Sequence, residues 1–170
     1  MPRKRATGNK MTSKPHITIR SGGQTGADRA ALDWAISKGV PHCGWCPRGR
    51  IAEDGILNSK YHLLETETKN YPERTRKNVE DADGTVLFSI SNTLTGGTLL
   101  TQQFAQRFNK PWLHLHPSLQ NPAQSLLYFI ERWDLKDINI AGPRLSTEPN
   151  ICKFVEEVLN ETFGEAVLHK

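Results

Sequence analysis

Residues 17–29 read Ile17-Thr18-Ile19-Arg20-Ser21-Gly22-Gly23-Gln24-Thr25-Gly26-Ala27-Asp28-Arg29. The short β-branched run predicts a strand, the Gly-Gly pair a turn, and the apolar pattern that begins near Ala30 a helix. The first N–H groups of a helix lack partners within it and carry the positive end of its dipole, so such a loop is typical of an oxyanion site. We therefore expect an anion to be contacted by Gly22, Gly23, Gln24, Thr25 and Gly26.

This loop matches neither of the two common phosphate-binding motifs. Gly22 and Gly23 are adjacent, which breaks the pattern Gly-x-Gly-x-x-Gly, and no Lys-Ser or Lys-Thr follows Gly26 as a Walker A motif requires. The sequence therefore disfavours ATP hydrolysis by a P-loop enzyme.

Strand and helix patterns alternate along the rest of the chain. We predict strands at 40–45, 84–89, 111–115 and 137–141, and helices at 72–81, 98–108, 123–133 and 148–163, with a long polar loop over 47–70. Such alternation predicts a three-layer, Rossmann-like α/β fold, with a mostly parallel sheet and helices on both faces. Ligands of such sheets bind beyond the carboxyl ends of the strands, where glycine loops at 22–26, 96–97 and 142–144 are expected to converge.

The positive charge of the chain is concentrated at its amino end. Residues 1–14 contain five basic residues and no acid, whereas the remainder carries 17 Lys and Arg against 18 Asp and Glu. We therefore expect a disordered basic tail over 1–14 and one ligand-binding domain over 15–170. The tail alone is poor support for a nucleic-acid role, and we do not expect nucleic acid as a partner.

Three cysteines suit a reducing compartment better than a disulfide framework, and neither a signal peptide nor a membrane-spanning run is evident, so we expect a cytoplasmic protein. Cys43 and Cys46 form a Cys-x-x-Cys pair, but the residues after it indicate a loop and no second pair exists to complete a zinc site. His114 and His116 alternate on a predicted strand. We expect no metal site at either pair.

Several longer motifs resemble those of the molybdenum cofactor carrier protein family. They are Ser-Gly-Gly-Gln-Thr-Gly-Ala-Asp-Arg-Ala-Ala-Leu-Asp at 21–33, Gly-Trp-Cys-Pro-Arg-Gly-Arg-Ile-Ala-Glu-Asp-Gly at 44–55, Tyr-Pro-Glu-Arg-Thr-Arg-Lys-Asn-Val at 71–79, Asp-Gly-Thr at 83–85 and Thr-Gly-Gly-Thr at 95–98. The resemblance covers roughly 16–163 and extends to a wider superfamily that includes lysine-decarboxylase-like (lonely-guy) and DprA-type proteins. It implies a protein that binds, protects and delivers molybdenum cofactor without chemical turnover. It also implies molybdoenzymes as recipients, and we expect a homo-oligomer.

Molybdenum cofactor is an anionic pterin with a dithiolene and a terminal phosphate, so it requires N–H donors and cations. Arginines suit this role because they bind oxyanions in bidentate fashion. Besides the first loop, we expect the cofactor to be bound by Arg48, Arg50, Arg74, Asn78, Ser89, Thr95, Gly96, Gly97, Thr98 and Arg144. We expect Arg48 and Arg74 to be exposed, so that their loss changes stability little.

The alternative is a nucleotide-binding sensor or a nucleoside-monophosphate N-glycosidase of the same superfamily. Lonely-guy enzymes carry a Glu after their second glycine loop, whereas Thr95-Gly96-Gly97-Thr98-Leu99-Leu100-Thr101 has none. Glu53 and Asp54 in the long loop are the remaining candidates for a catalytic acid. We therefore expect a binding protein with no catalytic residues.

Overall fold

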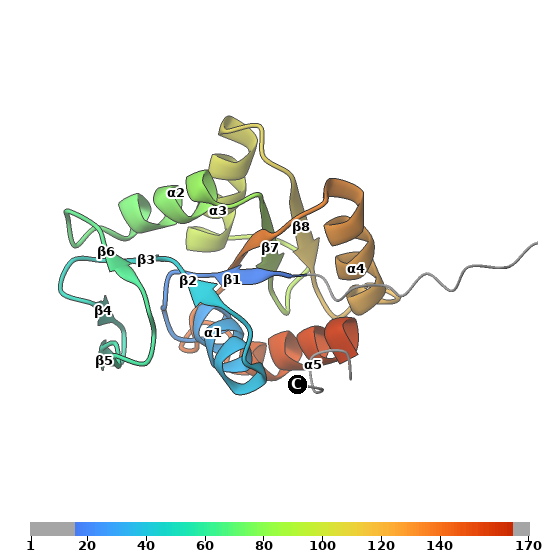
Figure 1. The fold of residues 1–170 in the computed structure, drawn as a ribbon, viewed down its shortest axis with the longest axis horizontal. Coiled ribbons are helices and arrows are strands. Elements are labelled where there is room, and N and C mark those ends of the chain that lie inside the picture. The colour runs from blue at the N-terminus through green and yellow to red at the C-terminus, as the bar shows by residue number, and fades with distance from the viewer. Residues whose placement is uncertain (1–15, 165–170) are drawn as a thin grey trace, which may run out of the picture.

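A parallel five-stranded sheet forms the centre of the molecule, and helices cover both of its faces (Figure 1). The structure is a computed structural model that describes residues 16–164, so the predicted tail over 1–14 lies outside the described residues. The helices are α1 (Ala27–Lys38), α2 (Tyr71–Asp81), α3 (Gly96–Arg107), α4 (Pro122–Trp133) and α5 (Ile151–Phe163). The strands of the central sheet are β1 (Thr18–Arg20), β2 (His42–Cys43), β7 (Gly84–Phe88), β8 (Trp112–Leu115) and β9 (Asp137–Ala141). This confirms the predicted Rossmann-like α/β fold.

The strands are ordered β2-β1-β9-β7-β8, and every neighbouring pair is parallel. The last strand of the chain therefore lies at the centre, between β1 and β7. If the count starts at β9, the order becomes 3-2-1-4-5, which is the order of a doubly wound dinucleotide-binding half. The sheet thus has this common arrangement, but its first strand comes last in the chain.

Helices α2 and α3 pack together on one face of the sheet, while α1 and α5 pack together on the other, with α4 beside α5 (Figure 1). The central strand β7 is buried along its length and β9 in its middle three residues, as expected for strands covered on both faces, and their buried residues are mostly apolar. The loops after β7 and β9 lead to helices on opposite faces, so a crevice opens between them at the carboxyl edge.

The long segment after β1 and α1 differs most from its prediction. The strand expected at 40–45 is divided at Gly44 into β2, which pairs with β1, and β3 (Trp45–Cys46), which pairs with another partner. A Cβ atom on Gly44 would overlap the Ser21 carbonyl. The expected loop contains a hairpin of β4 (Ile51–Ala52) and β5 (Gly55–Ile56), and β6 (Leu64–Glu65), which pairs with β3. A small apolar cluster anchors this segment, and its buried members are Leu32, Cys46, Leu57, Tyr61 and Leu63.

Candidate functional site

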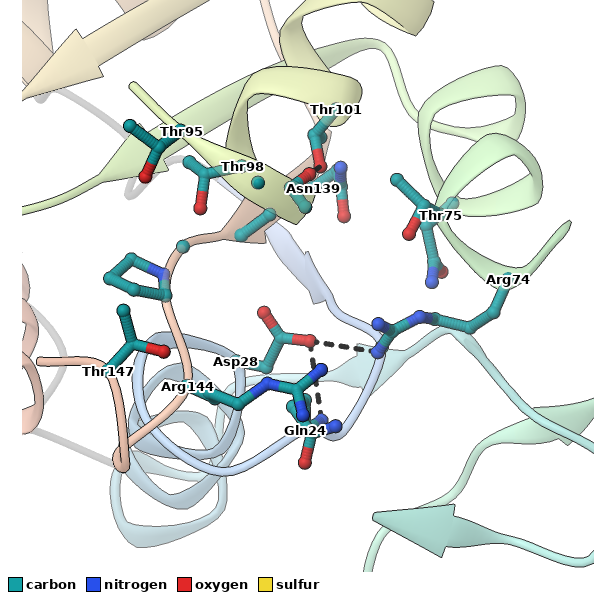
Figure 2. A pocket seen from close by; sticks show the side chains of 17 residues that line it. Gln24, Asp28, Arg74, Thr75, Thr95, Thr98, Thr101, Asn139, Arg144 and Thr147 are labelled. Carbon is teal, nitrogen blue, oxygen red and sulfur yellow. Dashed lines mark hydrogen bonds and ion pairs between the residues drawn. The ribbon is translucent and has the colours of Figure 1, made fainter. Parts of the chain in front are cut away.

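One pocket lies at the carboxyl edge of the sheet, in the crevice between β9 and β7 (Figure 2). It is formed by segments from the first glycine loop, the start of α1, α2, the start of α3, and the end of β9 with the loop that follows. Its polar lining consists of Gln24, Asp28, Arg74, Thr75, Asn78, Thr95, Thr98, Thr101, Asn139, Arg144 and Thr147, and Gly22, Gly96, Gly97 and Gly142 complete much of the wall. The three glycine loops that we expected to converge therefore line a single pocket.

A buried ion pair joins the two sides of this pocket. Arg74 Nη1 on α2 lies 3.2 Å from Oδ2 of Asp28 on α1, and the two side chains are 11% and 7% exposed. The guanidinium lies directly over Gly22, where any Cβ atom would overlap it, so this glycine makes room for the arginine. Burial raises the pKa of Asp28, while Arg74 and the Gln24 N–H oppose that shift. The expectation that Arg74 is surface-exposed is therefore wrong.

The backbone N–H groups of the first glycine loop are largely engaged within the protein. The Gln24 N–H donates to Asp28 Oδ2 at 3.3 Å, the Thr25 N–H donates to Gln24 Oε1 at 3.0 Å, and the Ala27 N–H donates to the Pro143 carbonyl at 3.2 Å. Gly26 has a φ of 83°, and a Cβ atom there would overlap the Pro143 carbonyl. Gly26 therefore allows the loop after β9 to pack against the start of α1.

Glu53 connects the long segment to the first glycine loop and to the loop after β9. Its carboxylate accepts hydrogen bonds from the hydroxyls of Thr25 and Ser146, and its own N–H donates to Gln24 Oε1 at 2.9 Å. The hydrogen bonds from Ser146 and Thr25 hold the pKa of Glu53 below its ordinary value. Asp54 beside it forms a two-pronged ion pair with Arg29, at 3.0 and 3.1 Å. Neither acid lines the pocket.

The second glycine loop opens directly into the pocket as the amino end of α3. Thr95 caps this helix without a side-chain hydrogen bond, and the first turn contains no acidic residue. A Cβ atom on Gly97 would meet nothing within 4 Å, so the space over this turn is open. Figure 2 shows Thr98 facing the cavity opposite the Asp28 side. This helix end is thus available to an anion in a way that the start of α1 is not.

Arg144 reaches across the mouth of the pocket from the loop after β9. Its side chain is 41% exposed, its Nη1 lies 3.9 Å from Glu53, and its guanidinium lies 5.5 Å from the ring of Tyr71. Figure 2 shows it extended above Gln24, beside the Asp28–Arg74 pair. These weak contacts leave the guanidinium accessible to a ligand.

The structure does not bring Arg48 and Arg50 to this pocket. Arg48 is exposed and lines a different hollow with Gly49 and Lys69. Arg50 donates to the carbonyls of Asn58, Tyr61 and Leu63 at 3.0, 2.9 and 3.2 Å, so it stabilises the long segment from within.

Asn78 and Ser89 also have partners within the protein. Asn78 lines the pocket, but its amide exchanges two hydrogen bonds of 2.9 Å with the backbone of Trp45. Ser89 lies outside the lining and contacts the Ser91 carbonyl and His114 Nε2, both at 2.6 Å.

The cysteine and histidine pairs lie elsewhere in the described residues. Cys46 is fully buried and Cys43 partly buried, and burial raises the pKa of both thiols. A raised pKa reduces the thiolate fraction that metal binding and redox chemistry require. Between residues 16 and 164 no group of three or more His, Cys, Asp or Glu side chains could hold a metal ion. No described helix is long and apolar enough to cross a membrane.

Sequence reasoning did not nominate five polar residues of the lining. These are Asp28, Thr75, Thr101, Asn139 and Thr147. Asp28 lies within the motif at 21–33. An acidic residue directly after a loop of the anion-binding type is unusual, and this could have identified Asp28 as a pocket residue. The other four gave no local signal, because only the packing of α2, α3 and β9 brings them together.

Comparison with known proteins agrees with this architecture. The model of the circularly permutated YpsA SLOG family matches residues 19–163. A crystal structure from Syntrophus aciditrophicus SB, described as "Putative molybdenum carrier protein", is 42% identical over 89% of this chain and 98% of that one, with a TM-score of 0.85. Among curated proteins, none shows significant similarity. The permuted family description fits a sheet whose first strand by topology, β9, comes last in sequence. The chain therefore belongs to the circularly permutated YpsA SLOG family.

Proposed function

We propose that this protein binds molybdenum cofactor in the pocket between β7 and β9, keeps it intact, and delivers it to molybdoenzymes. The observation that carries the proposal is the open amino end of α3, which faces the cavity without a side-chain cap or an acid in its first turn. The 42% identity to a protein described as a molybdenum carrier supports the choice of cargo.

The positions of donors and cations suit an anionic ligand. The N–H groups at Gly96, Gly97 and Thr98 would receive an oxyanion such as the terminal phosphate of the cofactor. Arg144 at the mouth would add a charge-assisted hydrogen bond. We propose α3 in preference to the loop at 22–26 for this role, because Gln24, Thr25 and Ala27 already direct their N–H groups at acceptors within the protein.

The alternative of an N-glycosidase draws little support from the two acids considered for it. Both Glu53 oxygens accept hydrogen bonds from hydroxyls, Asp54 is paired with Arg29, and neither residue lines the pocket. A catalytic acid must reach the bond that it protonates. We therefore retain binding without turnover as the proposed function.

The test is anaerobic purification of the full chain under reducing conditions, followed by metal analysis and pterin fluorescence, with reconstitution by isolated cofactor. Arg144→Ala should weaken cofactor binding by about 1.5–3 kcal/mol, the scale of a hydrogen bond to a charged group. Arg48→Ala is the matched control, because Arg48 is exposed and lies away from the pocket, and it should bind as the unmodified protein does.

Two results would contradict the proposal. One is a protein that neither retains nor takes up the cofactor. The other is release of free base from a nucleoside monophosphate, with loss of that activity in Glu53→Gln.

A further inference from the structure

The floor of the pocket contains a carboxylate, which an anion-binding site does not require. Asp28 is 5% exposed and lines the cavity. The hydrogen bonds from the Gln24 N–H and from Arg74 both fall on Oδ2, and the Gly22 N–H also faces the carboxylate. Figure 2 shows the other oxygen turned away from Arg74. A carboxylate repels a phosphate or molybdate placed against it. The part of the ligand that lies at Asp28 must therefore offer N–H or O–H donors.

The amide of Gln24, beside Asp28, has a fixed orientation. Its Oε1 accepts from the N–H groups of Thr25 and Glu53, at 3.0 and 2.9 Å. Its NH2 group must then point the other way, and this buried Nε2 has no hydrogen-bond acceptor among the described residues. Arg74 Nε is a second buried donor without an acceptor there. Buried donors are rarely left unpaired in folded proteins, so these two mark places for acceptor atoms of a ligand.

We propose that Asp28 and Gln24 form a subsite for the 2-amino-4-oxo-pyrimidine edge that pterins and guanine share. The ring N–H and the amino group of this edge donate to a carboxylate, and its oxo group accepts from an amide NH2. Phosphate and molybdate offer no N–H group, and their negative charge repels the Asp28 carboxylate, so neither matches this position. The inference rests on the proposed function, because it assigns the ring of the ligand to the floor and the anion to α3.

The experiment compares pterin with lumazine, which carries an oxo group in place of the 2-amino group, and GMP with IMP, which lacks that amino group. Affinities for the full chain come from fluorescence quenching and calorimetry. The unmodified protein should prefer the amino form of each pair by roughly 10-fold, the discrimination expected of one good paired contact. Equal affinity within both pairs would overturn the inference, and this comparison requires no variant.

Asp28→Asn should reduce or reverse the preference, because an amide can donate to the oxo group of lumazine. A purely structural role of Asp28 would instead lower the affinities for pterin and lumazine equally. Gln24→Glu, which keeps Oε1 and replaces the donor, provides a second variant if Asp28→Asn does not fold.

The two proposals can fail separately. If the protein discriminates GMP from IMP but does not bind molybdenum cofactor, the subsite stands and the carrier function fails. If it binds the cofactor without distinguishing pterin from lumazine, the subsite fails and the carrier function stands.

Discussion

Arg74 on α2 donates from Nη1 to Oδ2 of Asp28 on α1 at 3.2 Å, and its guanidinium occupies the space that a side chain at Gly22 would fill. This contact joins helices on opposite faces of the sheet. Both residues line the pocket, so this ion pair belongs to the pocket wall and also connects the two helices.

Removal of Arg74 should destabilise the protein. Arg74→Ala leaves the buried Asp28 carboxylate without its cation, and loss of one partner of a buried pair costs about 3–5 kcal/mol. Arg76→Ala on the same helix is the control, since Arg76 forms an exposed pair with Glu80 that contributes about 0.5 kcal/mol or less. Urea unfolding monitored by circular dichroism measures both. Similar midpoints for the two variants would contradict a structural role for the buried pair.

Two glycines should respond differently to alanine. Gly26→Ala places a Cβ atom on the Pro143 carbonyl at a φ of 83°, and should cost about 2–4 kcal/mol of stability. Gly97→Ala meets open space in the first turn of α3 and should leave stability unchanged or raise it by up to about 1 kcal/mol.

The methyl group of Gly97→Ala would lie beside the open helix end and should weaken ligand binding without unfolding the protein. Thermal unfolding and calorimetric titration of the same samples separate the two effects. Unchanged affinity in Gly97→Ala would argue against an anion at α3.

Glu53 should make stability depend on acidic pH. Hydrogen bonds from Ser146 and Thr25 lower its pKa in the folded protein, so its contribution is present above the ordinary carboxyl pKa and is lost as pH falls through the lower folded value. Glu53→Gln should therefore reduce the loss of stability below about pH 4.5. The exposed Glu161 on α5 supplies a control variant. The test is to measure unfolding midpoints from about pH 3 to about pH 7, a range that includes the titration of carboxyl groups. Identical pH profiles for the unmodified protein, Glu53→Gln and the Glu161 variant would refute the prediction.

Arg50 should matter for folding of the long segment. Its guanidinium donates to carbonyls of Asn58, Tyr61 and Leu63, and truncation should cost about 1.5–3 kcal/mol. Arg50→Ala should also increase proteolysis within 47–70, whereas Arg48→Ala should not. Limited proteolysis with mass spectrometry identifies the cleavage sites. A stable, protease-resistant Arg50→Ala protein that has lost ligand affinity would make Arg50 a binding residue after all.

Local patterns were sufficient for the elements of the sheet and for its parallel character. The β1–glycine loop–α1 unit and the apolar strand at 84–88 follow from residue type and periodicity, which act over a few neighbouring residues. Convergence of the three glycine loops also followed, because the carboxyl ends of parallel strands meet at one edge. The strands β4, β5 and β6 were not predicted, because each has only two residues, too few to show an alternating pattern, and β6 pairs with the distant β3.

The sequence by itself determined the fold class, the family motifs and the edge of the sheet at which the pocket lies. Only the tertiary structure decided that β9 lies at the centre of the sheet. That position brings Asn139 and Arg144 into one pocket with the glycine loops near Gly22 and Thr98. It also separated four similar arginines, with Arg144 at the mouth, Arg74 paired in the floor, Arg50 within the long segment and Arg48 on the surface. The physical reason is that propensity and periodicity act locally, whereas the partner of a side chain is set by packing between residues far apart in the chain.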